Sequence, residues 1–109
     1  MNRAVIFYES VFETKLRRQT VDGYDMAFFP RHDNAPGASG ALAKGDVYVP
    51  SKTGPIIYFD VPDIDPVLER AKAKGDTVLY LKKLIGEAGY VAEIEDSEGN
   101  RGALSAPGV

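Results

Sequence analysis

The chain repeats one pattern of segments at a fixed offset, and this repeat limits its fold more than any other feature. A helical pattern, a strand pattern and a strand of small residues each occur twice, at Arg3–Glu13 and Pro66–Gly75, Tyr24–Pro30 and Gly89–Glu95, and Ala38–Lys44 and Arg101–Pro107. Because all the offsets are about 63 residues, we interpret the segments as two copies of one structural unit.

Only the second copy opens with a strand-like segment. Gly54–Val61 is rich in β-branched and aromatic residues, which is typical of a strand. At the same offset, its counterpart would lie before Met1. We therefore expect the first copy to lack its first strand, which is either missing or encoded upstream. The sequence leaves open whether Met1 is the natural start.

Composition narrows the class of protein. With 109 residues, 44% of them hydrophobic and 27% charged, the chain is suited to one globular domain. The net charge is -3 with dispersed lysines and arginines, so we expect neither nucleic acid nor a membrane as a partner. The chain has no cysteine and no apolar run that could cross a bilayer. These features predict a cytoplasmic protein without disulfides.

The first half is expected to form a helix followed by three strands. Apolar residues recur at helical spacing in Arg3–Glu13. Lys15–Val21 and Tyr24–Pro30 flank Asp22-Gly23, a two-residue sequence that favours a tight hairpin turn. A polar loop, 31–37, leads to the third strand at Ala38–Lys44.

The second half is expected to read β-α-β-β-β. The first strand is Ile56–Val61, and the helix follows, capped by Asp65 with Pro66 in its first turn and ending at Gly75. Three further strands are predicted at Thr77–Leu81, Gly89–Glu95 and Arg101–Ser105, with a turn at Glu98–Asn100 and a turn edge at Lys82-Lys83. Module 1 thus spans about 1–45, a linker spans about 46–53 with a brief strand at Asp46–Val49, and module 2 spans about 54–109.

The order of these motifs resembles the vicinal oxygen chelate superfamily, which includes glyoxalases, bleomycin-resistance proteins and extradiol dioxygenases. The resemblance rests on Ile85–Asn100, on Asp60–Asp65 with its helix, and on Phe7–Phe12 and Met26–Pro30 in the first half. It is strongest with the small glyoxalase-like branch and covers nearly the whole chain. It implies an α+β fold in which paired β-α-β-β-β modules form curved sheets around a cleft, with module 1 lacking its first strand.

The resemblance also implies where a metal would bind. In the enzymes of the superfamily, side chains from the first and last strands of each module hold a divalent cation. The matching positions here are Ile56, Ala103, and Ala41 or a neighbour within Ala38–Lys44, and the fourth precedes Met1. Because aliphatic side chains do not coordinate metals, we predict no metal and no cofactor.

Strand periodicity predicts which side chains line the cleft instead. If Ile57, Phe59 and Val61 pack beneath the helix, alternate residues face the other way. Together with a mid-strand acid, the candidate ligand-binding residues are Ile56, Tyr58, Asp60, Glu93, Arg101, Ala103 and Ser105. A mainly apolar wall with a few polar groups is typical of small-molecule sites. No residue is assigned a catalytic role.

Each polar candidate also has a structural interpretation. Tyr58 is expected to be a packed aromatic residue, and Asp60 to pair with Arg101 or Lys44 at the sheet rim. Glu93 is either a buried acid that serves as a general base or an exposed one. His32, the only histidine, lies in the polar loop, where a surface role is favoured.

Two functional hypotheses remain. The first is a metal-free protein that binds a small apolar or aromatic molecule. The second is a metal-dependent lyase, isomerase or dioxygenase of the same superfamily that completes its site from outside this chain. Because the incomplete first module leaves a sheet edge unpaired, we also expect a homodimer, with or without exchanged strands. The sequence does not identify the ligand.

Overall fold

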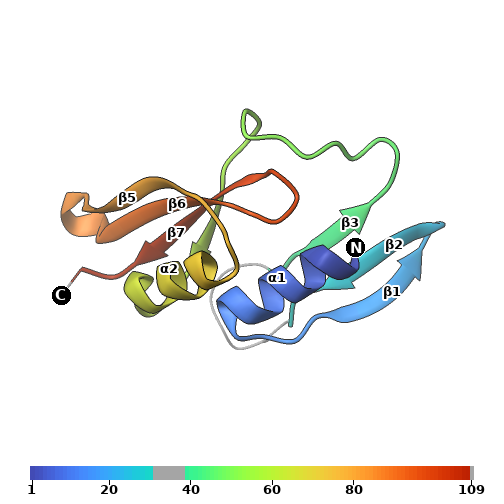
Figure 1. Ribbon diagram of the computed structural model, residues 1–109, viewed down its shortest axis with the longest axis horizontal. Helices are drawn as coiled ribbons and strands as arrows, with labels where there is room; N and C mark the ends of the chain where they lie inside the picture. Colours follow the sequence, from blue (N-terminus) through green and yellow to red (C-terminus); the bar gives the residue numbers. More distant parts are fainter. Residues whose placement is uncertain (31–38, 109) are drawn as a thin grey trace. The chain divides into compact units, whose positions relative to one another are not determined.

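The computed structural model describes residues 1–30 and 39–108 and groups the chain into two compact units, Met1–Val49 and Pro50–Val109. The boundary lies within the predicted linker. Figure 1 shows a helix and a strand meander in each unit. The predicted α+β class is therefore confirmed. No helix of the described residues has the length and apolar character to span a membrane.

The first unit consists of α1 (Asn2–Phe12), β1 (Arg17–Val21), β2 (Tyr24–Phe28) and β3 (Ala41–Lys44). Its three strands form an antiparallel sheet in the order β1-β2-β3. The predicted hairpin is confirmed: Asp22 and Gly23 both have positive φ, at 50° and 79°, as a tight two-residue turn of this hand requires. Residues 46–49 form no strand, unlike the prediction for Asp46–Val49.

One face of α1 supplies the apolar core of the first unit. Its buried residues are Ala4, Phe7, Tyr8 and Val11. The Tyr8 ring meets the Phe29 ring edge-on, and the ring centroids are 5.8 Å apart. This lies within the range of about 4.5 to 7 Å that is typical of aromatic pairs. Arg18 Nη1 donates a hydrogen bond to Asn2 Oδ1, which joins β1 to α1.

In the second unit, a strand precedes the helix. It consists of β4 (Ile57–Asp60), α2 (Ile64–Ala73), β5 (Val78–Leu84), a short 3-10 helix, η1 (Gly86–Ala88), β6 (Tyr90–Glu95) and β7 (Arg101–Ala106). The sheet order is β4-β7-β6-β5. Strand β4 pairs in parallel with β7, and the other pairs are antiparallel. Within the described residues, α1 is preceded by no counterpart of β4.

Helix α2 begins earlier than the sequence suggested. The N-cap is Asp63 rather than Asp65, and its side chain accepts a hydrogen bond from the Asp65 backbone N–H. Pro66 therefore occupies the third helical position. A proline is tolerated there because the first-turn N–H groups have no partner within the helix.

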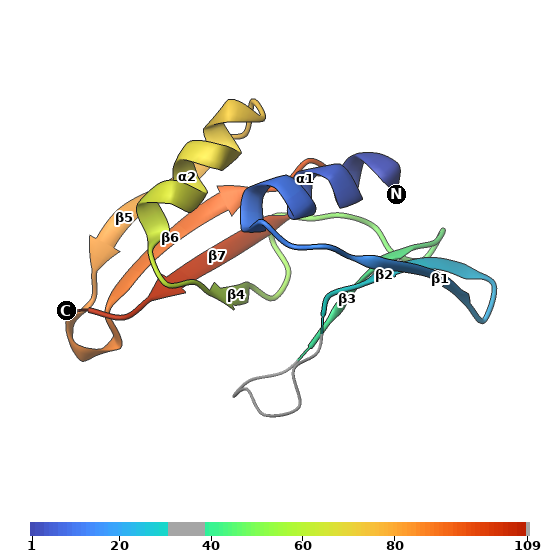
Figure 2. The ribbon, with the colours of Figure 1, turned by 90° about the horizontal axis from the view of Figure 1, so that it is seen from below.

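One face of the second sheet is covered by α2, which packs mainly on β5, β6 and β7 (Figure 2). Ile64, Val67, Leu68 and Ala71 of the helix are buried, and so are Ala92, Ile94 and Leu104 of the sheet. The register places Phe59 on the same face, opposite Leu104. Ile57 shares this face but is exposed, because it lies on the edge strand. The prediction that Ile57 packs beneath the helix was therefore wrong.

Strand β5 is longer than predicted and includes both Lys82 and Lys83, which we had assigned to a turn edge. Lys82 Nζ lies 3.0 Å from Asp65 Oδ2 on α2 and 4.5 Å from the centre of the Tyr90 ring. The hydrogen bond that Lys82 Nζ donates to the Asp65 carboxylate raises the pKa of Lys82 above its ordinary value of 10.5. Lys82 thus connects the helix to the sheet beneath it.

Candidate functional site

The residues proposed to bind a ligand lie on the face of the second sheet that α2 leaves uncovered. Residues opposite one another in neighbouring strands point to the same side of a sheet. The register pairs Tyr58 with Ala103, and Ala103 with Glu93. Glu93 in turn pairs with Tyr80 of β5. These four residues form one transverse row across all four strands, on the side opposite to Leu104.

The remaining candidates extend this face along the strands. Asp60 lies opposite Ser105, and Arg101 lies opposite Glu95. Ile56 immediately precedes β4 and is partly exposed. The structure thus brings the sequence-predicted residues to one helix-free face, which we define by Ile56, Tyr58, Asp60, Tyr80, Glu93, Arg101, Ala103 and Ser105. Tyr80 was missed, since its assignment to this face depends on irregular pairing between β5 and β6.

Tyr58 and Tyr80 form the exposed ends of the transverse row. Their exposed fractions are 56% and 43%, whereas Ala103 between them is fully buried. The expectation that Tyr58 is a packed aromatic residue was therefore wrong. Aromatic side chains at the surface provide flat apolar area beside a polar hydroxyl. The helix-free face can stack against an aromatic ring.

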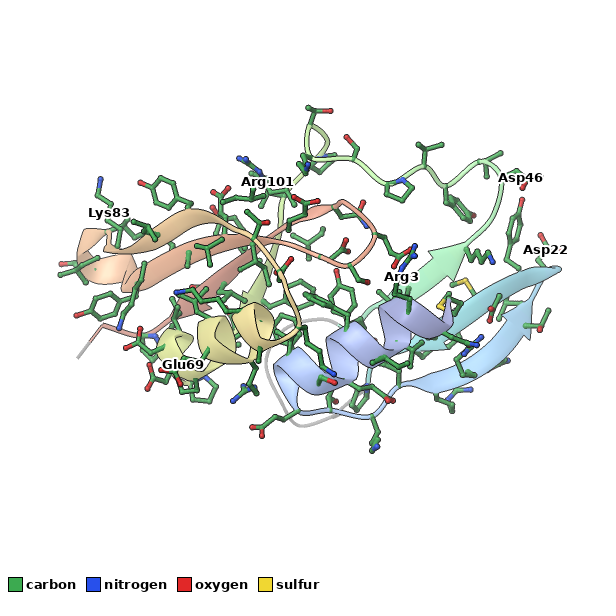
Figure 3. The ribbon with its side chains drawn as sticks, in the orientation of Figure 1. Arg3, Asp22, Asp46, Glu69, Lys83 and Arg101 are labelled. Carbon is green, nitrogen blue, oxygen red and sulfur yellow. The ribbon has the colours of Figure 1, made fainter. Side chains whose placement is uncertain are left out.

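An ion pair gives the face its polar character. Arg101 Nη1 lies 3.0 Å from Glu93 Oε1, and the two side chains are 35% and 17% exposed. Figure 3 labels Arg101 at the start of β7. Asp60 was predicted to pair with Arg101 or Lys44, but Arg101 pairs with Glu93. Glu93 is also neither exposed nor isolated, because the diagonal between β6 and β7 brings it within reach of a long guanidinium side chain.

The Glu93–Arg101 pair has unused hydrogen-bonding capacity. Although the two charges are close, Glu93 Oε1 and Arg101 Nε are both buried without a hydrogen-bond partner. Leaving such an atom unsatisfied costs about 1 to 3 kcal/mol. A molecule that satisfies either atom after a small side-chain rotation would recover part of that cost.

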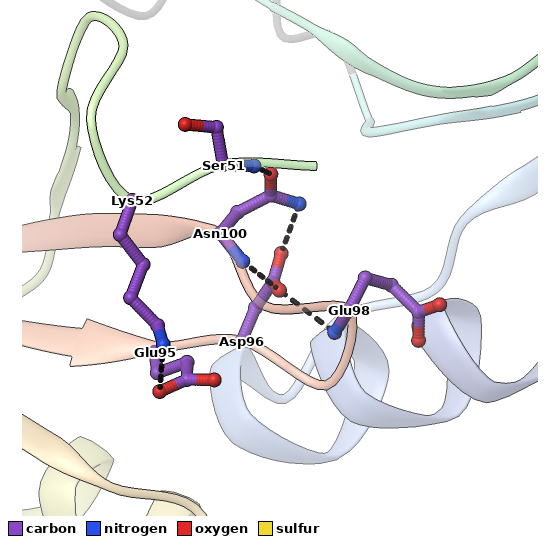
Figure 4. A network of polar contacts seen from close by, with 6 residues as sticks. All are labelled: Ser51, Lys52, Glu95, Asp96, Glu98 and Asn100. Carbon is purple, nitrogen blue, oxygen red and sulfur yellow. Dashed lines mark hydrogen bonds and ion pairs between the residues drawn. The ribbon is translucent and has the colours of Figure 1, made fainter. Parts of the chain in front are cut away.

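A second polar network fixes the turn at one end of the face (Figure 4). Asp96 Oδ1 accepts hydrogen bonds from the backbone N–H groups of Glu98 and Asn100, at 2.8 and 2.9 Å. Asp96 Oδ2 accepts one from Asn100 Nδ2, and Asn100 Oδ1 accepts one from the Ser51 backbone N–H. The acidic segment is thus a hairpin turn, as predicted, and Asp96 is its organising residue.

The positions that would hold the metal of the superfamily do not fit a cation. Ala103 lies on the helix-free face between Tyr58 and Glu93, and Ala41 lies opposite Phe28 in the first unit. With Ile56, these positions offer only aliphatic side chains. Among residues 1–30 and 39–108, no group of three or more His, Cys, Asp or Glu side chains is arranged to hold a metal ion. His32 lies outside the described residues.

A separate cavity of about 480 Å³ lies beside α1 in the first unit. It is lined by Ile6, Glu9, Ser10, Glu13, Thr14 and Lys15. The carboxylate of Glu9 already accepts a hydrogen bond from the Leu16 backbone N–H at 2.8 Å. Glu9 therefore has a structural role in ending the helix, and the cavity contains none of the predicted site residues.

Solved structures share this fold at low sequence identity. A glyoxylase/bleomycin resistance protein/dioxygenase domain from Frankia sp. EAN1pec has a TM-score of 0.74 and 16% identity, covering 98% of this chain and 83% of that one. A mutant of the fosfomycin resistance protein FosX from Listeria monocytogenes, complexed with Mn(II) and 1S,2S-dihydroxypropylphosphonic acid, has a TM-score of 0.71 and 20% identity, with coverages of 100% and 84%.

A glyoxalase I mutant from Zea mays has a TM-score of 0.73 and 19% identity, and the match covers 99% of this chain but 42% of that one. A comparison with curated protein sequences returned no match. The family model described as Glyoxalase/Bleomycin resistance protein/Dioxygenase superfamily matches residues 1–104. The chain therefore belongs to this superfamily.

Proposed function

We propose that the protein binds a small aromatic molecule on the helix-free face of its second sheet, without a metal. The observation that carries the proposal is the transverse row of Tyr58, Ala103, Glu93 and Tyr80. Two exposed aromatic residues flank a small buried residue and a charged one, a combination of apolar area and a few polar anchors that suits small ligands.

The Glu93–Arg101 pair supplies the polar anchor. It presents an acceptor and a donor side by side, each with an unsatisfied atom. Because the charges of the pair cancel, we propose a neutral ligand, such as an aromatic ring that carries a hydroxyl or amide group. The aliphatic residues at Ile56, Ala41 and Ala103 support binding without a metal.

Binding is tested by titrating isotope-labelled protein with 2-naphthol, indole and catechol while recording backbone amide NMR shifts. We expect the shifts to cluster at Tyr58, Glu93 and Ala103 for at least one probe. Tyr58→Ala should weaken binding of that probe about fivefold, since aromatic pairs contribute about 0.5 to 1.5 kcal/mol beyond the area that they bury.

Tyr48→Ala is the matched control, because Tyr48 is half-exposed in the other unit and outside the helix-free face. It should leave the affinity unchanged. Shifts that cluster elsewhere, an absence of shifts with all three probes, or equal affinities of the Tyr58→Ala variant and the wild type would contradict the proposal.

The second candidate is a metal-dependent enzyme of the superfamily. It is favoured by the structural similarity to FosX, a relative that has been crystallised with Mn(II). This function needs metal ligands from outside the described residues, because the matching positions inside them lack donor atoms.

Whichever function holds, we propose that the protein acts as a homodimer, since both sheets have unpaired edges.

A further inference from the structure

The Glu93–Arg101 pair brings two opposite hydrogen-bonding requirements together on the helix-free face. The two residues lie diagonally on neighbouring strands, because Glu93 is opposite Ala103, and Arg101 precedes Ala103 by two positions on β7. Arg101 Nη1 lies 3.0 Å from Glu93 Oε1. A carboxylate only accepts hydrogen bonds and a guanidinium only donates them. A ligand that satisfies both groups must therefore donate to one and accept from the other.

One atom of each residue remains to be satisfied. Among the described residues, Glu93 Oε1 and Arg101 Nε have no hydrogen-bond partner and are shielded from solvent. Their side chains are nevertheless 17% and 35% exposed, so a small rotation brings either atom to the surface. A hydrogen bond formed in such a surrounding is strengthened, and a ligand group left without a partner there is unfavourable. The pair therefore selects a ligand by its pattern of donors and acceptors.

Charge narrows the class of ligand. Glu93 repels a ligand carboxylate, and Arg101 repels a ligand ammonium group, so neutral groups remain. A hydroxyl must make both hydrogen bonds with one oxygen, whereas an amide has its donor and its acceptor on separate atoms. In a small ring the amide is held planar and cis, so its N–H and C=O point to the same side. This flat edge matches the planar carboxylate and guanidinium groups.

A flat surface for the ring lies beside the pair. Tyr80 is directly opposite Glu93 on the neighbouring strand β5, and its side chain is exposed. Tyr80, Glu93 and Arg101 thus lie on three adjacent strands. A ring that stacks on Tyr80 can direct one edge at the Glu93–Arg101 pair.

We propose that the ligand is a planar cyclic amide, a lactam. Its N–H donates to Glu93 Oε1, its C=O accepts from Arg101 Nε, and its ring stacks on Tyr80. This inference rests on the proposed function, because it concerns the same face and names the class of molecule that binds there. A site that makes hydrogen bonds to both groups discriminates against analogues that lack one of them, since a buried polar atom is then left without a partner.

Three neutral two-ring probes test the proposal by NMR titration of isotope-labelled protein. 2-Quinolone is a lactam, N-methyl-2-quinolone has lost the donor, and 2-naphthol carries a hydroxyl instead. We expect 2-quinolone to bind about tenfold more tightly than either of the others, because they cannot make both hydrogen bonds to charged groups with good geometry. 4-Methyl-2-quinolone is the control for the added methyl group and should bind like 2-quinolone.

A substitution at Glu93 assigns the preference to this site. Glu93→Leu removes the acceptor, so 2-quinolone should bind no more than about twofold more tightly than N-methyl-2-quinolone. Glu69→Gln is the matched control for loss of a negative charge, because Glu69 is exposed on α2, which covers the other face of the sheet. It should retain the full preference.

The Arg101 Nε–H signal reports on the second hydrogen bond in the wild type. 2-Quinolone should shift this signal downfield, as expected when an N–H group begins to donate to a carbonyl. The Nε–H signal of Arg70 on α2 is the internal control and should stay in place. This measurement needs no variant, so it decides the question together with the probe series if Glu93→Leu does not fold.

The outcomes separate this inference from the function on which it rests. If 2-quinolone, N-methyl-2-quinolone and 2-naphthol bind with similar affinities, the proposed function stands and the lactam assignment is wrong. An undiminished preference in folded Glu93→Leu, or an Arg101 Nε–H signal that does not move with 2-quinolone, would also overturn the assignment. If none of the probes binds, both proposals are wrong.

Discussion

Among the described residues, Asp76 is a carboxylic acid whose pKa is clearly raised. It follows α2, and its Oδ2 atom is buried without a hydrogen-bond partner. Burial raises the pKa of Asp76 from 3.8 to about 6, and the charges of Glu95 and Asp96 add to this, while a hydrogen bond from the Thr77 backbone opposes it. The folded protein therefore holds this proton more tightly than the unfolded chain.

The sign of the resulting pH dependence follows from linkage. Between about pH 4 and 6 the unfolded chain has lost the Asp76 proton and the folded protein retains it, so the contribution of Asp76 to stability falls as pH rises through this window. Asp76→Asn should abolish this part of the pH dependence. At pH 7.5 it should stabilise the protein by about 1 kcal/mol, a value reduced for partial solvent exposure.

Urea unfolding of wild type and Asp76→Asn at pH 4.5 and 7.5 measures the effect. The exposed Asp46→Asn is the control for loss of one negative charge. If the unfolding free energy of the wild type and of Asp76→Asn changed equally between the two pH values, Asp76 would not be the source of this pH dependence.

The sequence predicted well which face of the sheet a residue lies on. It predicted less well which residue of a neighbouring strand is its partner. Alternation along β7 placed Arg101, Ala103 and Ser105 correctly on one face. The pairing of Arg101 with Glu93 depends on strand register, which the sequence does not specify. Gly89 was assigned to a strand start, although its φ of 91° and a clash of any Cβ with Ala106 O at 2.2 Å make it the residue that permits this chain reversal.

The turn between β6 and β7 is the element that depends most on one side chain. Asp96 is buried and accepts three hydrogen bonds from Glu98 and Asn100. Through Asn100, it also holds the Ser51 backbone. The turn and the segment that precedes β4 are therefore coupled.

Asp96→Ala should lower the unfolding free energy by about 2 to 4 kcal/mol, because it leaves several part-buried donors without an acceptor. Ser97→Ala, in the same turn, should cost less than about 0.5 kcal/mol, since Ser97 bonds only to the neighbouring Glu98 side chain. Denaturant unfolding measures both. A loss for Asp96→Ala no larger than that for Ser97→Ala would show that the network contributes little.

Elements with a local chemical signal were predictable, and those set by tertiary packing were not. The Asp22-Gly23 turn specified the β1-β2 hairpin because few residue pairs adopt its positive φ angles. The N-cap of α2 is Asp63 and not the predicted Asp65. Both aspartates can cap a helix, and the burial of Ile64 favours the earlier one. The exposed Asp46–Val49 segment has the composition of a strand but pairs with no described strand.

At the scale of the whole molecule, the internal repeat was the most informative feature. It predicted a helix followed by three strands in the first unit and the order β-α-β-β-β in the second, and the structure confirms both. A repeat is visible in sequence because each copy must bury the same apolar face.

We propose that this member of the superfamily works without a metal, because Ile56, Ala103 and Ala41 are aliphatic at the positions where the resemblance implies metal ligands. Elemental analysis of protein purified without chelators tests it most directly. We expect far less than one equivalent of Mn, Fe, Ni or Zn per chain. A stoichiometric amount of any of these metals, retained through gel filtration, would contradict it.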